Sequence, residues 1–240
     1  MKILYLYHDL MNLYGESGNI RALERRLTDQ GERVTVERRS IGDTLDFTGC
    51  NFLYIGAGTE RSQKAALEHL RPYAAQLKAA LDGGMHALFT GNAASMLGKE
   101  IVDGVGKAWA GLGLLDFVAR EQKDVRYVGD AIAVHPELEQ PLVGFVNKCE
   151  DWEGEVPPLL RMTMGRGNGP DTKDEGIWQG NLLATHLTGP VLVKNPAFHN
   201  WLLGRLLGRE LAPKAYPYEE KAWQVTYEAL MARKDQPAGS

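Results

Sequence analysis

Short, uninterrupted runs of apolar residues alternate with longer amphipathic segments through the first hundred positions of the chain. A continuous apolar run is typical of a strand buried on both faces of a parallel sheet, and it predicts a strand at residues 2–7. Short strand-like segments bounded by turn residues predict further strands at 34–38, 51–55 and 85–90. Helical periodicity predicts helices at 18–30 and 63–81, and a short helix from Gly91-Asn92 to Leu97. This alternation predicts a doubly wound, mostly parallel α/β sheet flanked by helices.

The second half of the chain carries shorter and more scattered strand signals. They predict strands at 117–119, 131–134, 142–146 and 182–186, which we expect to be antiparallel additions to the sheet. The glycine-rich segment 164–170 is not set between a strand and a helix, so a surface loop is favoured over a phosphate-binding turn. Amphipathic helices are predicted at 196–207 and 218–233, followed by a polar tail.

We expect one domain over residues 1–210, with a C-terminal helix and tail over 211–240. The 240 residues, 44% of them hydrophobic, suffice for a full core. A net charge of -4 argues against binding to nucleic acid or to an anionic membrane surface. The first apolar run is too short for a signal peptide, and no later segment has the length of a membrane span.

The cysteine usage favours a cytoplasmic protein and gives no sign of a metal site. We expect no cofactor. Cys50 and Cys149 lack the spacing of metal ligands, and a chain of this size without paired cysteines suits a reducing compartment.

Three strand ends locate a candidate site. The turns at 7–9, 56–58 and 91–92 follow parallel strands, so they should share one crevice. A strand, a tight turn and a helix with small residues around one exposed side chain form a nucleophile elbow, and here that side chain would be Asn92. Backbone N–H groups of Gly58 and Ala93 could bind substrate as oxyanion donors. Taken alone, the turn is more simply a polar helix cap.

The chain resembles the cobyric acid synthase type of class I glutamine amidotransferase, and within it the glutaminase subunits of lipid II isoglutaminyl synthase. The resemblance runs from Leu4 to about Leu203. It rests on glycine-rich and polar motifs at 9–15 with 18–19, 55–58, 82–84, 111–115, and 189–190 with 194–196. The first motif is fairly specific, whereas the glycine turns are common in α/β folds.

The resemblance implies a catalytic cysteine and a histidine, and this chain has neither where the motifs place them. The cysteine position matches Asn92, and the histidine position matches Thr188. His186 lies two residues earlier on the same strand face, so a role as a residual base stays open, although a hydrogen-bonded structural histidine is favoured. Arg126 matches the arginine that holds the glutamine substrate, and the alternative is a solvated surface arginine.

Two functions follow from the resemblance. One is an amidotransferase subunit that pairs with a Mur-ligase-like synthetase in peptidoglycan precursor amidation and is deficient in glutamine hydrolysis. The other is a pseudoenzyme that acts as a scaffold, or as a sensor of glutamine or a related small molecule, for a ligase. Cys50, Cys149 and Ser95 are the other candidate nucleophiles, and all three are expected to be structural.

Overall fold

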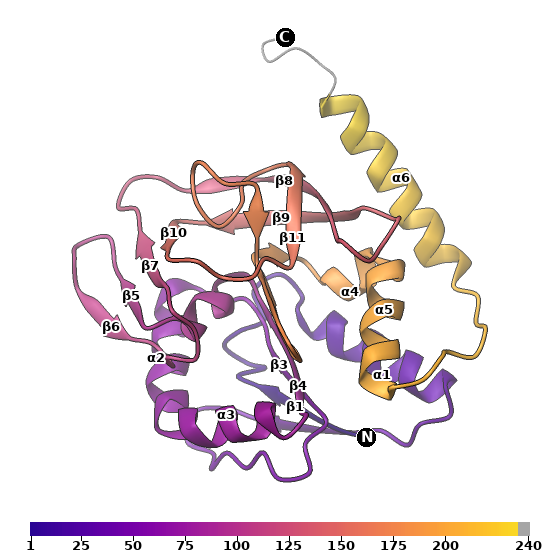
Figure 1. The fold of residues 1–240 in the computed structure, drawn as a ribbon, viewed down its shortest axis with the longest axis horizontal. Coiled ribbons are helices and arrows are strands. Elements are labelled where there is room, and N and C mark those ends of the chain that lie inside the picture. The colour runs from indigo at the N-terminus through magenta and orange to yellow at the C-terminus, as the bar shows by residue number, and fades with distance from the viewer. Residues whose placement is uncertain (235–240) are drawn as a thin grey trace.

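A six-stranded sheet forms the centre of the computed structural model, which describes residues 1–234 (Figure 1). The strand order is β13-β14-β4-β3-β1-β2, and all neighbours are parallel except β13, which pairs antiparallel with β14. The strands are β1 (Lys2–Leu6), β2 (Thr35–Arg39), β3 (Phe52–Ile55), β4 (His86–Thr90), β13 (Ile177–Gln179) and β14 (Leu182–Thr185). The prediction of a mostly parallel α/β fold is confirmed.

Helices cover both faces of this sheet (Figure 1). Alternate side chains of the inner strands enter two separate hydrophobic clusters, one with α2 and α3 and the other with α1 and α5. The helices are α1 (Ser17–Asp29), α2 (Glu60–Leu70), α3 (Ala74–Asp82), α4 (Val191–Lys194), α5 (Pro196–Leu207) and α6 (Pro217–Lys234). The single helix predicted at 63–81 is divided by a 3-10 turn, Arg71–Tyr73, which contains Pro72, a residue without a backbone donor.

Most strands of the second half of the chain form two smaller sheets instead of extending the central one. Their strand orders are β10-β7-β5-β6 and β12-β11-β8-β9-β15. The strands are β5 (Glu100–Val102), β6 (Ala108–Ala110), β7 (Val118–Glu121), β8 (Tyr127–Val134), β9 (Leu142–Lys148), β10 (Glu150–Glu153), β11 (Leu160–Met164), β12 (Asp174–Glu175) and β15 (Leu187–Thr188). The strand predicted at 182–186, β14, does join the central sheet, but parallel to β4, and β13 adds to it antiparallel. The strands predicted at 117–119, 131–134 and 142–146 lie in the smaller sheets, so the expectation that they extend the central sheet was wrong.

The glycine-rich segment 164–170 is partly internal. Gly167, Asn168 and Gly169 are buried, which corrects the prediction of a surface loop for these residues. The ammonium group of buried Lys148 donates to the carbonyls of Gly167 and Asn168, at 2.6 and 3.2 Å. The Asn168 side chain exchanges two further hydrogen bonds with the backbone of Gly176. The segment therefore satisfies buried polar groups of the second half.

The C-terminal helix α6 lies against β8 and β9 at one side of the body (Figure 1). The end of the helix is held there by an ion pair between Arg233 and Asp130, at 2.8 Å. The helix contacts the strands through an apolar cluster, in which Leu230 of the helix is buried against Ile132 and Val143. The predicted tail after this helix falls outside the described residues. None of the helices in residues 1–234 is long and apolar enough to cross a membrane.

A buried arginine connects α1 to the C-terminal segment. The Arg26 side chain is 1% exposed, donates to the Pro196 carbonyl at 3.1 Å and to Asn200 Oδ1 at 2.5 Å, and forms an ion pair with Glu219. Its guanidinium also lies 4.1 Å from the centre of the Tyr216 ring. One side chain thus fixes the approach of the last helix.

We expect Arg26→Met to lower the free energy of unfolding by about 2–4 kcal/mol, because it removes a buried charge that has several partners. The matched control is Arg25→Met. Arg25 has an exposed side chain that pairs only with Asp29 on the same helix, and we expect that change to cost less than about 0.5 kcal/mol. Urea unfolding of the three proteins measures both values, and equal losses would contradict the anchoring role.

Candidate functional site

A cavity of about 180 Å³ lies at the carboxyl edge of the central sheet. It is lined by Leu13, Tyr14, Ala57, Gly58, Thr59, Glu60, Asn92, Arg126, Asn147 and Thr188. We call this cavity the cleft. The turns at 56–58 and 91–92 meet there, as the strand ends predict, whereas the turn at 7–9 does not line it. Four of the predicted site residues, Gly58, Asn92, Arg126 and Thr188, therefore share one cleft.

In the bend after β4, the strained backbone conformation falls on Gly91 and not on Asn92, the residue expected at the centre of the elbow. Gly91, the first residue of the helical turn 91–97, has the left-handed backbone, with a φ of 59°, whereas Asn92, the second residue, has no positive φ. The Asn92 side chain is 9% exposed, and its amide is bound to the backbone of Gly58. The prediction that the bend presents Asn92 as an exposed side chain is wrong, because the glycine adopts the strained conformation. The match between Asn92 and the cysteine position stays a prediction.

The expected oxyanion donor on Gly58 is already engaged. The Gly58 N–H donates to Asn92 Oδ1 at 3.0 Å, and Asn92 Nδ2 donates to the Gly58 carbonyl at 2.9 Å. Ala93 is fully buried in the 3-10 helix η2 (Gly91–Leu97), which ends before Gly98 as predicted. In this conformation, therefore, the Gly58 N–H is not free for a ligand.

Thr188 forms the wall of the cleft opposite the bend. Strand β15 pairs with β9 and places Thr188 beside Phe145, whose carbonyl accepts the threonine hydroxyl at 3.0 Å. Unlike an imidazole, a threonine hydroxyl does not take up and release a proton near neutral pH, so Thr188 cannot act as a general base.

Arg126 enters the cleft from the loop before β8 and is held by two side chains. Its guanidinium forms an ion pair with Glu60 and donates to Asn147 Oδ1 at 2.8 Å, and Asn147 Nδ2 donates to Tyr14 Oη at 2.6 Å. Although partial burial opposes it, the hydrogen bond from Arg126 holds the pKa of Glu60 below its usual value. Arg126 is thus a fixed cation at the cleft that already holds one carboxylate.

His186 lies outside the cleft. It is 1% exposed, with Nδ1 3.3 Å from Glu175 Oε1, and its ring centre is 4.4 Å from that of Trp152. Its backbone N–H also donates to Glu175 at 2.6 Å. The idea that it points into the crevice as a residual base is therefore wrong. The structure agrees with the favoured interpretation, a hydrogen-bonded structural histidine.

Ser95 and Cys50 are also removed from the cleft. The Ser95 hydroxyl is fully buried, donates to Glu150 at 3.0 Å and accepts from the Trp152 indole at 2.9 Å. Cys50 is buried before β3 and has Sγ 3.3 Å from the Phe52 carbonyl. Both side chains are structural, as expected.

Comparison with known proteins places this geometry in a family. The family model of the CobB/CobQ-like glutamine amidotransferase domain matches residues 2–196. The chain belongs to this family. It is 34% identical to the lipid II isoglutaminyl synthase (glutamine-hydrolyzing) subunit GatD of Staphylococcus aureus (strain N315), over 92% of this chain and 90% of that protein. The corresponding subunit of Streptococcus pneumoniae (strain ATCC BAA-255 / R6) is 26% identical, over 81% and 76%.

Solved structures of glutamine amidotransferases share the fold. One has a TM-score of 0.54 at 19% identity, with 85% of this chain and 98% of that chain covered. A second, from Thermotoga maritima, also has a TM-score of 0.54, at 10% identity, over 99% and 86%. At these identities the likeness concerns the fold alone, and it extends to the second-half strands around the cleft.

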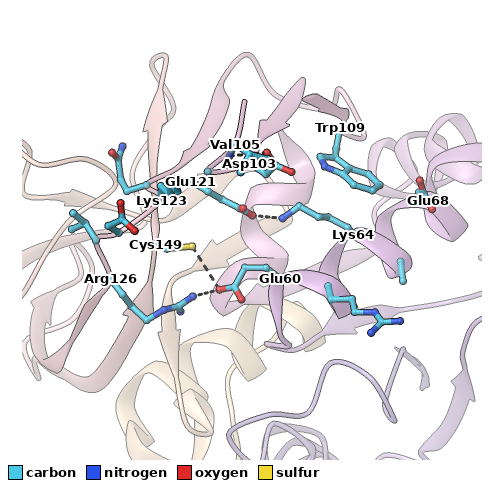
Figure 2. Close-up of a pocket in the computed structure, with 16 residues that line it drawn as sticks. Glu60, Lys64, Glu68, Asp103, Val105, Trp109, Glu121, Lys123, Arg126 and Cys149 are labelled. Atoms are coloured by element: carbon cyan, nitrogen blue, oxygen red, sulfur yellow. Dashed lines mark hydrogen bonds and ion pairs between the residues drawn. The ribbon is translucent and has the colours of Figure 1, made fainter. Parts of the chain in front are cut away.

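A wider pocket of about 850 Å³ adjoins the cleft and shares Glu60 and Arg126 with it (Figure 2). Figure 2 shows Cys149 directed at Glu60, with Sγ 3.6 Å from Oε1. Burial, with the charge of nearby Glu150, raises the pKa of this thiol to about 12, so it is protonated at neutral pH. Sequence reasoning missed this placement, because only the pairing of β9 brings Cys149 here.

The buried state of His186 leads to a pH prediction. Burial, with the charge of Lys148, lowers its pKa below the usual value. The unfolded chain therefore binds a proton near pH 6.5 that the folded chain does not, so stability present above that pH is lost as the pH falls. We expect His186→Phe to reduce the slope of unfolding free energy against pH below 6.5 by up to about 1.4 kcal/mol per pH unit. Urea unfolding between pH 5 and 8 measures it, and an unchanged slope would contradict a neutral buried histidine.

Proposed function

We propose that this chain is the amidotransferase-type subunit of a lipid II isoglutaminyl synthase, paired with a Mur-ligase-like synthetase, and that it does not hydrolyse glutamine. The pairing and the substrate are supported by the similarity to the two GatD subunits, which extends over most of each chain. The loss of hydrolysis is supported by the side chains of the cleft.

The observation that carries the loss of hydrolysis is the set of residues that line the cleft in the described part of the chain. It includes no cysteine, histidine or lysine. Its hydroxyl groups are engaged: Thr188 donates to Phe145, Thr59 accepts from the Ser62 N–H as a helix cap, and Tyr14 accepts from Asn147. Attack on a carboxamide needs an activated nucleophile with a base in hydrogen-bond reach, and the cleft holds no such pair.

As a consequence, this chain would serve its ligase partner as a scaffold. The fold and its outer surface persist, while ammonia for the amidation is taken from solution instead of being released from glutamine in the cleft. The synthetase would then use free ammonia as the nucleophile toward an activated glutamate.

A second candidate function, recognition of a small amino acid, is favoured by Arg126. A fixed guanidinium at a polar cleft suits an α-carboxylate through paired hydrogen bonds, with Glu60 as the carboxylate to be displaced. In that case the subunit senses a metabolite for its partner.

The amidation assay of the reconstituted complex tests the proposal. We expect ammonium chloride to support ATP-dependent amidation of lipid II, and glutamine at equal concentration to support a rate at least 100-fold lower, because the cleft lacks the catalytic pair. Cys149→Ser is the matched control for the one thiol near the cleft. A glutamine-driven rate comparable with the ammonium rate would refute the proposal, and its loss in Cys149→Ser would assign the reaction to that residue.

Calorimetry with glutamate tests the sensor function. If the cleft receives an α-carboxylate, Arg126→Ala weakens binding at least tenfold, because the only cation in the lining is removed. Arg120→Ala is the control, since Arg120 is an exposed arginine paired with Glu153 away from the cleft. Absence of binding to the wild-type protein would leave the scaffold function alone.

A further inference from the structure

We propose that the Asn92 side chain fills the part of the cleft in which a ligand carboxamide would bind. We also propose that the bend would direct a side chain outward, into the cleft, at residue 91 and not at residue 92. This inference rests on the proposed function and adds the reason why a glutamine side chain is excluded. It makes Asn92 a specificity-determining residue that closes the site to a primary carboxamide.

The first observation is the pair of hydrogen bonds between the Asn92 side chain and the backbone of one residue, Gly58. Its oxygen accepts from the Gly58 N–H at 3.0 Å, and its nitrogen donates to the Gly58 carbonyl at 2.9 Å. A side-chain carboxamide from a ligand would need the same donor and the same acceptor. Asn92 thus presents to Gly58 the functional group of glutamine itself.

The backbone of Asn92 is held as firmly as its side chain. The buried Gln63 side chain of α2 donates to the Asn92 carbonyl at 2.5 Å. The amide is therefore positioned from both ends, and its contact with Gly58 is part of a fixed local network instead of one orientation of a free side chain.

The second observation concerns the direction in which a side chain would leave the bend. A Cβ placed on Gly91 would lie 3.0 Å from Thr188 Cγ2 and 2.5 Å from Ala57 Cβ. Residue 91 therefore faces Thr188, whereas residue 92 faces Gly58. The contact with Ala57 is too short for any side chain, so the glycine is required both by its positive φ and by this neighbour.

Three small groups consequently fill the floor of the cleft: the methyl groups of Ala57 and Thr188, and the amide of Asn92. A ligand carboxamide reaches the Gly58 N–H only when Asn92 gives up both hydrogen bonds. Removal of this amide should open a space that has one donor and one acceptor ready for a carboxamide.

The binding test compares glutamine with norvaline, an amino acid of similar length without the carboxamide. In the wild-type protein we expect no preference between them by calorimetry. In Asn92→Ala, and in Asn92→Gly as a second variant, we expect glutamine to bind at least tenfold more tightly than norvaline. The control is Asn181→Ala, which removes an amide at the opposite end of the sheet near Gly84. Like the wild type, this variant should bind glutamine and norvaline without preference.

Amide hydrogen exchange at Gly58 gives a second readout that does not depend on affinity. We expect slow exchange in the wild-type protein, at least tenfold faster exchange in Asn92→Ala, and renewed protection on addition of glutamine. A tenfold glutamine preference already present in the wild type, or none in either folded Asn92 variant, would overturn the proposal. Glutamine hydrolysis by the wild type would instead overturn the proposed function, so the two failures are distinguishable.

Cysteine accessibility tests the assignment of the outward position. In a Cys149→Ser background, we expect Gly91→Cys, combined with Ala57→Gly to make room, to react with iodoacetamide at least tenfold faster than Asn92→Cys. Cys50 is buried in both proteins and serves as the internal baseline. Equal rates, or faster reaction at position 92, would show that Asn92 faces the cleft opening and would overturn the assignment.

Discussion

The buried carboxylate of Glu16 holds together the segments that build the cleft. It is fully buried and accepts hydrogen bonds from the Tyr54 hydroxyl, from Thr90 Oγ1 at 2.7 Å, from Asn19 Nδ2 at 3.1 Å and from the Gly189 N–H at 3.2 Å. These donors come from β3, β4, α1 and the turn after β15. One carboxylate therefore fixes four segments that are far apart in the sequence, and the bend at residue 91 follows directly from one of them.

This hub imposes its own constraints on the chain. A buried carboxylate requires several donors in place of water, and burial together with Glu16 raises the pKa of Tyr54 well above its usual value, so that the hydroxyl remains a donor. The hub also leaves no space at Gly56, where a Cβ would lie 2.6 Å from Glu16 Cβ and 2.5 Å from the Met11 carbonyl. The glycine turn after β3 is thus required by packing as well as by any role in binding.

The sequence predicts the central sheet well because its inner parallel strands are buried apolar runs, such as Phe52–Ile55. It predicts the second half poorly. Strand β10 has the sequence Glu-Asp-Trp-Glu, in which no apolar run is visible. Its first residue, Glu150, is nevertheless buried, and the Ser95 hydroxyl donates a hydrogen bond to its carboxylate. Likewise, the sequence locates the bend after β4 but not the direction of its side chains, because the positive φ belongs to Gly91 and the orientation of Asn92 depends on Gly58, which is distant in the chain.

The polar groups at the floor of the cleft bind one another, and these hydrogen bonds are separate from the ones that hold the surrounding segments together. An enzyme must keep donors unpaired so that they can receive charge as it develops in the reaction, and such preorganised groups are held at a cost in stability. Here Asn92 satisfies Gly58, and Thr188 satisfies the carbonyl of Phe145. Neither side chain takes part in the hydrogen bonds of Glu16. The hydrogen bonds that hold the segments around the cleft together therefore do not depend on the side chains of its floor.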